Sequence, residues 1–260
     1  MGKIIVIGGG AAGMMAAAAA AEQGVKVIVY EKNEKLGKKL FITGKGRCNL
    51  TNHCDMETLF GNVVTNGKFL YSAFYGFDNQ AAMDWFEKAG CRLKTERGGR
   101  VFPVPDHSSD VIGALSGQLK RGKADIRLRQ QVKSLLVQEG RIKGVKLSDG
   151  KTEYGDCVIL ATGGLSYPLT GSDGDGYRMA EENGHTIKET SPSLVPFIVR
   201  EKWCRDLQGL SLKNVKMFLG PEGKKAFYEG FGEMLFTHFG VSGPLVLSAS
   251  SYYRKKCKEG

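Results

Sequence analysis

Apolar and glycine-rich stretches alternate over the first 31 residues of the chain. Residues 4–7 are all apolar, glycines stand at positions 8, 9, 10 and 13, an alanine-rich run follows, and residues 27–30 are apolar again. A short apolar run bounded by turn residues is typical of a buried strand, and alanine favours helix. The pattern predicts a strand, a glycine turn, a helix and a second buried strand.

Three further helices are predicted along the chain. Residues 79–89 begin with Asn79, a residue type that caps helices, and end before Gly90, a frequent stop signal. The other two helices are expected over 106–120 and from Gly176 to Asn183.

From residue 125 to residue 160 the pattern changes to short alternating stretches, with turns at 139–140 and 148–150. This predicts a series of short strands, of which the last, residues 157–161, is apolar and ends in glycines. Beyond residue 191 the chain is strand-rich, with a hairpin about residues 220–223. The pattern indicates an α/β domain followed by a second, strand-rich one.

The first glycine turn has the layout of a dinucleotide-binding βαβ unit. Gly8 permits a tight turn, Gly10 lets the backbone approach a pyrophosphate, and Gly13 lets the helix pack onto the strand. Glu31 stands 18 positions after Gly13, close to the roughly 20 expected for a carboxylate that binds a ribose 2′-hydroxyl. We place Ala12 beside the cofactor in the same turn, with the helix N-terminus facing the anion.

The acidic residue and the position of the turn favour FAD. Glu31 suits the adenosine ribose of either FAD or NAD, but a carboxylate repels the 2′-phosphate of NADP. A unit of this kind at the very start of a chain is commonest in FAD proteins.

The segment after Glu31 is strongly basic. Cations far outnumber the single acid, Glu34, and glycines at 37, 44 and 46 expose backbone N–H groups. This composition suits a pyrophosphate, although a solvated basic loop has the same composition. The cations are Lys32, Lys35, Lys38, Lys39, Lys45 and Arg47.

Several motifs resemble the BaiN/RdsA family of FAD-dependent oxidoreductases. The most specific is Thr-Gly-Lys-Gly-Arg-Cys-Asn-Leu-Thr-Asn at residues 43–52, whereas Ala-Thr-Gly-Gly at 161–164 is shared by many flavoproteins. The resemblance covers nearly the whole chain, with further matches at residues 37–40, 171–177, 192–196 and 232–244.

The resemblance implies a Rossmann-like FAD-binding fold. We expect a doubly wound parallel sheet with a β-meander over residues 1–191 and the start of a barrel-like, β-rich substrate domain over 192–260. Family members continue beyond this length, so we expect the chain to be a fragment or a truncated product.

The motifs and the resemblance together give a set of expected FAD contacts. Residues 43–49 are expected along the pyrophosphate and toward the flavin, with Arg47 supplying charge, and Val132 beside the adenine. The full set is Gly8, Gly10, Ala12, Gly13, Glu31, Lys32, Lys39, Thr43, Gly44, Arg47, Cys48, Asn49, Val132, Ala161, Thr162, Gly163 and Asp175.

The resemblance also implies the reaction, in which the flavin passes a hydride to an activated carbon–carbon double bond. NAD(P)H would reduce the flavin from a transient site, because no second glycine fingerprint is present. The reaction needs a proton donor, for which Cys48, His238 and Tyr177 are candidates in that order. For Cys48 a role as buried filler is equally favoured, and for His238 a role as a core histidine.

The net charge of +10 bears on the substrate. Basic surfaces favour phosphate-rich partners, so a uridine in ribosomal RNA is preferred over a small, steroid-like enone. A non-catalytic dinucleotide- or RNA-binding module remains the alternative from another class. The excess cations cluster at Arg92, Lys94, Arg97 and Arg100, at Arg121, Lys123, Arg127 and Arg129, and at Arg254, Lys255, Lys256 and Lys258.

Composition restricts the class of protein further. The chain has 42% hydrophobic and 25% charged residues, and no apolar run approaches the roughly 18 residues of a membrane span. We therefore expect a cytoplasmic protein without membrane attachment or signal peptide. Six cysteines form no CxxC pair. Cys48, His53 and Cys54 lie close together but lack a second ligand pair, so reduced thiols and no metal are expected.

Overall fold

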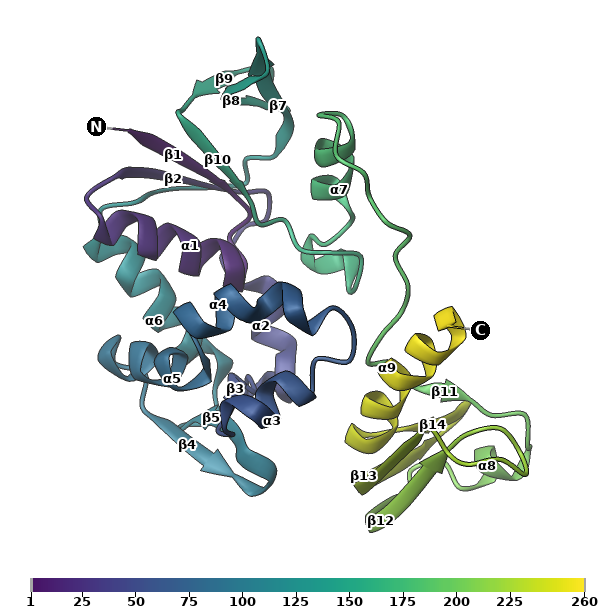
Figure 1. Ribbon diagram of the computed structural model, residues 1–260. Helices are drawn as coiled ribbons and strands as arrows, with labels where there is room; N and C mark the ends of the chain where they lie inside the picture. Colours follow the sequence, from purple (N-terminus) through teal and green to yellow (C-terminus); the bar gives the residue numbers. More distant parts are fainter. Residues whose placement is uncertain (1, 260) are drawn as a thin grey trace. The chain divides into compact units, whose positions relative to one another are not determined.

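The computed structural model describes residues 2–259, the side chains of the last two residues excepted, and the chain forms two compact units (Figure 1). Unit 1 comprises residues 2–55 and 72–187, and unit 2 comprises residues 56–71 and 188–259. The side chain of Lys258, in the third basic cluster, lies outside the described residues.

Unit 1 is built on a four-stranded parallel sheet in the order β10-β1-β2-β6. Its strands are β1 (Lys3–Ile7), β2 (Lys26–Glu31), β6 (Asp125–Leu128) and β10 (Cys157–Leu160). The strand–turn–helix–strand pattern at the start of the chain is therefore confirmed. The first of the short strands expected after residue 125 pairs with β2 in this sheet.

Helices cover one face of the sheet, with α1 (Ala11–Glu22) and α6 (Ser108–Arg121) side by side (Figure 1). Because successive strand residues point to opposite faces, Val6 and Val29 pack against these helices. The expected helix over 106–120 is thus confirmed and begins two residues later.

The opposite face of the sheet carries the β-meander. Its strands β7 (Val132–Gln138), β8 (Arg141–Leu147) and β9 (Thr152–Tyr154) are joined at the two predicted turns. Ile5 and Ile28 of the parallel sheet pack here, together with residues of the meander and of α7 (Asp175–Glu181). The α/β fold with a parallel sheet and a meander is confirmed.

A smaller antiparallel sheet and short helices complete unit 1. The sheet has the order β3-β5-β4, from Thr51–Asn52, Arg100–Pro103 and Leu93–Glu96. The helices are α2 (Lys38–Ile42), α5 (Asn79–Lys88) and α4 (Tyr71–Gly76), whose first residue is counted with unit 2.

The cap of α5 differs from the expected one. Asp78, not Asn79, is the N-cap, and its carboxylate accepts a hydrogen bond from the Ala81 N–H at 2.7 Å. The Asn79 amide instead donates to the carbonyls of Asn52 and Cys54 at 2.6 and 2.7 Å. A carboxylate and an amide are both good caps, so sequence alone did not separate these neighbours.

Unit 2 contains a four-stranded antiparallel sheet, β11-β14-β13-β12. Its long strands β12 (Ser211–Leu219) and β13 (Tyr228–Thr237) form the predicted hairpin, and β14 (Gly240–Ser242) pairs with β11 (Phe197–Ile198). The helices are α3 (Met56–Gly61), α8 (Trp203–Asp206) and α9 (Pro244–Glu259).

Helix α9 was not predicted, although two signals for it are present. Pro244 is its first residue, where the missing N–H has no consequence, and a basic run lies near its end. Among the described residues no helix is both long and apolar enough to cross a membrane.

Candidate functional site

A cavity of about 500 Å³ opens where the strands of the parallel sheet end. Its walls come from the ends of β1, β2 and β10, the starts of α1 and β7, and the helices α2 and α7. The predicted cofactor residues that line it are Gly8, Gly10, Ala12, Glu31, Lys32, Lys39, Thr43, Val132, Ala161, Thr162, Gly163 and Asp175.

The three glycines of the turn serve different purposes. A Cβ atom on Gly13 would lie 1.8 Å from the Gly8 carbonyl oxygen, so Gly13 permits the close packing of α1 on β1. Gly8 has a φ of 108°, and a Cβ there would lie 2.4 Å from the Ala161 carbonyl oxygen. A Cβ on Gly10 would meet no protein atom within 4 Å, although Gly10 lines the cavity. Gly10 therefore keeps space open for a ligand.

The N-terminus of α1 faces this space with its N–H groups uncapped. Gly10 is the N-cap, no side chain caps the helix, and the first turn holds no acid. Gly10, Ala11 and Ala12 all line the cavity. Uncapped N–H groups and the helix dipole together favour an anion at this point.

Glu31 is buried and held in one orientation by three donors. Its Oε1 accepts hydrogen bonds from the backbone N–H and side-chain amide of Asn33, at 2.8 and 2.7 Å. Among the described residues, its Oε2 accepts only from the Gly9 N–H, at 2.7 Å. A carboxylate oxygen has two lone pairs, so Oε2 retains capacity for one more donor such as a ribose hydroxyl.

Two lysines of the cavity differ in how their charge is balanced. Lys32 forms ion pairs with Asp173 at 2.6 Å and Asp175 at 3.1 Å. Burial lowers its pKa, but these hydrogen bonds outweigh that effect and leave the pKa above its usual value. Burial also disfavours ionised Asp175, yet its contacts with Lys32 leave the carboxyl pKa low.

Lys39, in contrast, makes no ion pair within the described part of the chain. Its Nζ donates to the hydroxyls of Ser172 at 2.7 Å and Ser166 at 3.3 Å. Burial lowers its pKa, and no acid compensates. A half-buried cation without a counter-ion, on a cavity wall, is suited to an anionic ligand.

The residues that follow β10 line the cavity, and glycines let them pack closely against the segment before α7 and the start of that helix. Gly163 has a φ of 78°, and a Cβ there would lie 2.5 Å from the Ser172 hydroxyl. A Cβ on Gly176 would lie 2.3 Å from the Thr162 hydroxyl. The two neighbouring glycine-rich motifs, residues 161–164 and 171–177, are therefore packed together beside the cavity.

Five of the predicted residues do not line the cavity: Gly13, Gly44, Arg47, Cys48 and Asn49. Asn49 is exposed, and its amide faces the carbonyls of Thr51 and Val101 at 3.1 and 3.2 Å. Gly44 has a φ of 57°, and a Cβ there would lie 2.9 Å from the Asn49 backbone nitrogen. Gly44 and Asn49 therefore shape the loop of residues 44–49 and not the cavity wall.

The charge of Arg47 is directed to the small antiparallel sheet. Its Nε and Nη2 donate to Asp106 at 2.9 and 2.7 Å, and Nη2 also donates to Glu96. Its guanidinium stacks on the Phe102 ring, 4.1 Å from the centroid. Hydrogen bonds with the two acids raise the Arg47 pKa, so this cation is already neutralised within the protein.

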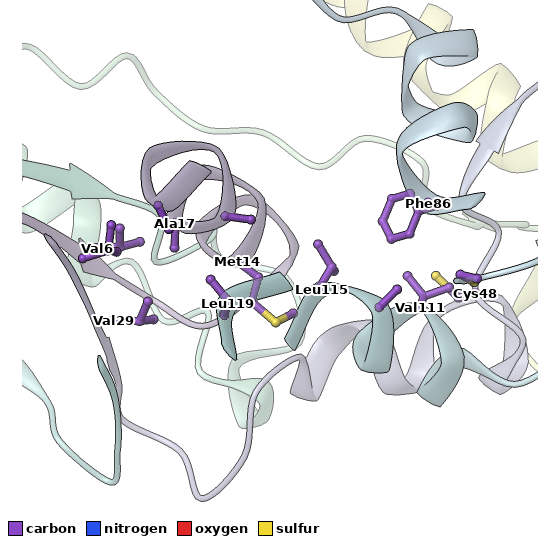
Figure 2. Packing of buried hydrophobic residues seen from close by; sticks show 14 residues of the cluster. Val6, Met14, Ala17, Val29, Cys48, Phe86, Val111, Leu115 and Leu119 are labelled. Atoms are coloured by element: carbon purple, nitrogen blue, oxygen red, sulfur yellow. The ribbon is translucent and has the colours of Figure 1, made fainter. Parts of the chain in front are cut away.

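Cys48 lies in the hydrophobic core, 2% exposed. Figure 2 shows it beside Val111 of α6, far along the cluster from the sheet residues Val6 and Val29. Burial raises the pKa of its thiol, and a hydrogen bond with Thr43 offsets this only in part. The surroundings match the buried-filler alternative.

The other candidate proton donors have different surroundings. His238 is exposed in the turn between β13 and β14 of unit 2, edge-on to Phe239, so it is not a core histidine. Tyr177 is half-buried in α7 of unit 1, and a Cβ on Gly164 would lie 3.2 Å from its hydroxyl.

Sequence reasoning missed several residues of the cavity wall. Asn33 and Ser172 stand inside motifs that the sequence singled out, and Gln130 is two residues before Val132. Met179, fully buried in α7, had no signal. Among the described residues, no group of three His, Cys, Asp or Glu side chains could hold a metal ion.

Comparison with known proteins identifies the family. Residues 2–250 match the model of the HI0933-like protein Rossmann domain. The chain belongs to the HI0933-like family. This confirms the resemblance seen in the sequence motifs.

Two curated relatives of this HI0933-like chain are enzymes. It is 34% identical over 238 residues to a 3-dehydro-bile acid delta(4,6)-reductase of Clostridium scindens, and 33% identical over 234 residues to the ribosomal RNA dihydrouridine synthase of Escherichia coli. Each alignment covers 90% of this chain and 56% of the relative, so the chain spans just over half the length of these proteins.

A solved structure supports the fold. The open conformation of a flavocytochrome c3 fumarate reductase matches 82% of this chain and 47% of its own, with a TM-score of 0.58 and 22% identity. At this identity the similarity concerns the fold alone.

Proposed function

We propose that the chain is part of an FAD-dependent oxidoreductase that reduces an activated carbon–carbon double bond. The observation that carries the proposal is the cavity at the sheet edge, where an uncapped helix N-terminus, an unpaired lysine and an oriented carboxylate converge. These are the three groups that a pyrophosphate and its adjoining ribose require.

The residues present fit the adenosine half of FAD. Gly10 leaves room beside the helix N-terminus, Lys39 supplies positive charge, and Glu31 keeps one acceptor free on Oε2. The charge of Lys32 is balanced by ion pairs with Asp173 and Asp175. These ion pairs would hold the segment that contains the two aspartates beside the ribose. When bound, the flavin supplies a hydride from its ring, which the protein's own side chains cannot.

The names of the two relatives support a common reaction type. A delta(4,6)-reductase acts on carbon–carbon double bonds, and dihydrouridine is uridine with its ring double bond saturated. Both reactions add a hydride and a proton across a conjugated double bond, with NAD(P)H as the proposed source of electrons.

The basic charge favours ribosomal RNA as the substrate, as the sequence suggested. In the second cluster Arg127 is paired with Asp125 and Glu153, but Arg121, Lys123 and Arg129 are exposed without ion pairs in the described chain. A small enone remains the alternative substrate, because the two relatives are almost equally similar.

Of the candidate proton donors, the exposed His238 has better access to a substrate than the buried Cys48. A catalytic acid must reach the substrate before its pKa matters. We therefore propose His238 ahead of Cys48, which reverses the order expected from sequence.

The first test is the absorption spectrum of the purified chain mixed with FAD and passed through a desalting column. Retained flavin that NAD(P)H bleaches supports the oxidoreductase, and a colourless protein that binds RNA supports the non-catalytic module. The second test compares dihydrouridine in ribosomal RNA from cells with and without the gene. If the purified chain retains flavin but the dihydrouridine content of ribosomal RNA is the same with and without the gene, a small enone is favoured as the substrate.

A further inference from the structure

The parallel sheet of unit 1 has a second edge, opposite the cavity. Because its four strands run in one direction, their first residues lie at this second edge and the cavity lies where they end (Figure 1). Connections of three residues join α1 to β2 and α6 to β6, so both helices end at the second edge. A Cβ atom on Gly122 would lie 2.5 Å from the Ala21 Cβ, which shows how closely the two helix ends pack there.

The β-meander reaches the same edge and forms a cleft there. The Asp156 N–H donates to the carbonyl oxygen of Lys3, the first residue of β1, at 2.8 Å, and the Gly155 N–H donates to the Lys143 carbonyl oxygen at 3.0 Å. The cleft has a volume of about 510 Å³, and the ring of Tyr154 on its wall is 62% exposed. Its lining residues are Arg141, Ile142, Lys143, Tyr154, Gly155 and Asp156.

Exposed cations from distant parts of the sequence gather along this edge, and none forms an ion pair within the described part of the chain. Nearby acids are mostly engaged: Asp125 is paired with Arg127 at 2.8 Å, and the Asp156 carboxylate accepts the Lys3 backbone N–H at 2.7 Å. Glu22, at the end of α1, is exposed. We call these cations the basic edge: Lys26 at the start of β2, Lys120, Arg121 and Lys123 at and after the end of α6, and Arg141 and Lys143 in β8.

The topology also divides the second basic cluster of the sequence. Arg121 and Lys123 precede β6 and belong to the basic edge, whereas Arg129 follows β6, on the side of the cavity. Four strands at a spacing of about 4.8 Å make the edge about 14 Å wide, which matches roughly four stacked nucleotides at about 3.4 Å each. Unpaired cations beside an exposed aromatic ring are the features that bind an unpaired nucleic-acid strand, through its phosphates and its bases.

We propose that the basic edge is a docking surface for substrate RNA, with phosphates on its cations and one unpaired base stacked on Tyr154. This inference rests on the proposed function, since it takes RNA as the substrate. The docking surface lies at the sheet edge opposite the cofactor cavity. It therefore adds affinity for a long RNA without contacting the reacting atoms, and it offers nothing to a small enone.

The test measures binding of a fluorescent, uridine-rich RNA of about 12 nucleotides, within the usual site size of single-strand binders, to the full chain. Fluorescence anisotropy at several salt concentrations gives both the affinity and its salt dependence. Replacing Arg141 and Lys143 together by alanine should weaken binding about tenfold. The slope of log affinity against log salt should become shallower by about 1.4, at about 0.7 per lost phosphate contact.

The matched control replaces Lys146 and Lys151 together by alanine. It removes the same charge from exposed side chains of the meander that do not line the cleft, and it should change the affinity less than about twofold. Tyr154→Ala should weaken binding at least about fivefold with the salt slope unchanged, whereas Tyr154→Phe keeps the ring and should bind normally. Flavin retention should be equal in all variants, because these residues do not line the FAD cavity.

The outcomes separate this inference from the proposed function. If the wild type retains flavin but binds no RNA, the docking surface is wrong, while the oxidoreductase stands with a small enone as substrate. Equal weakening by the edge variant and its control would mean that only net charge matters, and it overturns the inference. Binding to phosphatidylserine vesicles without binding to RNA would also overturn it, in favour of a lipid surface. If the wild type binds neither flavin nor RNA, both proposals fall.

Discussion

Lys39 and Arg47 belong to the same basic segment, yet the structure uses them in opposite ways. Lys39 lies on the cavity wall, with two serine hydroxyls and no acid in the described chain as partners. Arg47 lies in the motif loop, residues 44–49, with its guanidinium bound to Asp106 and Glu96 and stacked on Phe102. A cation that is already paired contributes little to the recognition of a further anion.

The same contrast holds for the polar groups around them. The cavity wall offers uncapped N–H groups and a free acceptor on Glu31, whereas the loop packs Cys48 in the core. The polar groups of the cavity wall are available to a ligand, whereas those of the motif loop already have partners within the protein. A single sequence motif can therefore contain both residues that bind a ligand and residues that support the fold around them.

The largest expected effect comes from Gly10→Val. The side chain would fill the open space beside the α1 N-terminus without meeting protein atoms at its Cβ. We expect ADP and FAD to bind more than about 100-fold more weakly, while the melting temperature stays near that of the wild type. Calorimetry and thermal unfolding measure the two quantities.

Gly13→Val is the control for that variant. Its Cβ would lie 1.8 Å from the Gly8 carbonyl oxygen, so it should unfold the domain. If Gly10→Val retains normal affinity, the cavity wall is not the nucleotide site and the comparison between the two regions loses its basis.

The next effect concerns the reactivity of Cys48. Iodoacetamide should modify Cys48 at least about 100-fold more slowly than the exposed Cys157, because burial both shields the thiol and raises its pKa. Peptide mass mapping of the intact protein over time measures both rates. Rapid modification of Cys48 that ADP prevents would instead place this thiol at the cavity.

Part of the site could be predicted from the sequence and part could not. The turn after β1, the start of α1 and Glu31 follow short-range rules of spacing, so their predicted place at the sheet edge agrees with the cavity. The partners of Arg47 come from 49 and 59 positions away, and the motif itself contains no sign of them. Acidic residues that are distant in sequence but close in the folded chain therefore determine which cation has a counter-ion.

The same reason accounts for the missed cavity residues. Ser172 reaches Lys39 across 133 positions, and Gln130 gains its place only because β6 pairs next to β2. The sheet order that brings these groups together is a property of the whole unit. The motifs therefore predict candidate residues, and the sheet topology determines which of them line the cavity.

A smaller effect is expected from Lys39→Ala. The loss of the unpaired cation should weaken ADP binding about tenfold and make it less sensitive to salt. Lys35→Ala removes the same charge from an exposed side chain off the cavity wall, and it should change the affinity less than twofold. Equal effects of the two variants would mean that only net charge matters.

The pH dependence of Lys39 gives an independent check. Burial lowers the pKa of its free ammonium, and a bound phosphate would raise it again. ADP affinity should therefore be greatest below the lowered pKa and fall as the pH rises through it. Lys39→Ala should show no such fall over the same range.

The smallest effect on binding is expected from Arg47→Ala, although the sequence motif would suggest the largest. Its two acids hold the motif loop to the small antiparallel sheet, so the variant should lower the melting temperature. ADP affinity should stay within about threefold of the wild type, because the guanidinium charge is already paired. Asp106→Asn should behave alike, and the double variant should be less unstable than the two separate effects predict, since they remove one interaction. If Arg47→Ala weakens ADP binding as much as Lys39→Ala does, while Asp106→Asn leaves it unchanged, then Arg47 turns from its acids to the phosphates, and the loop belongs to the binding site after all.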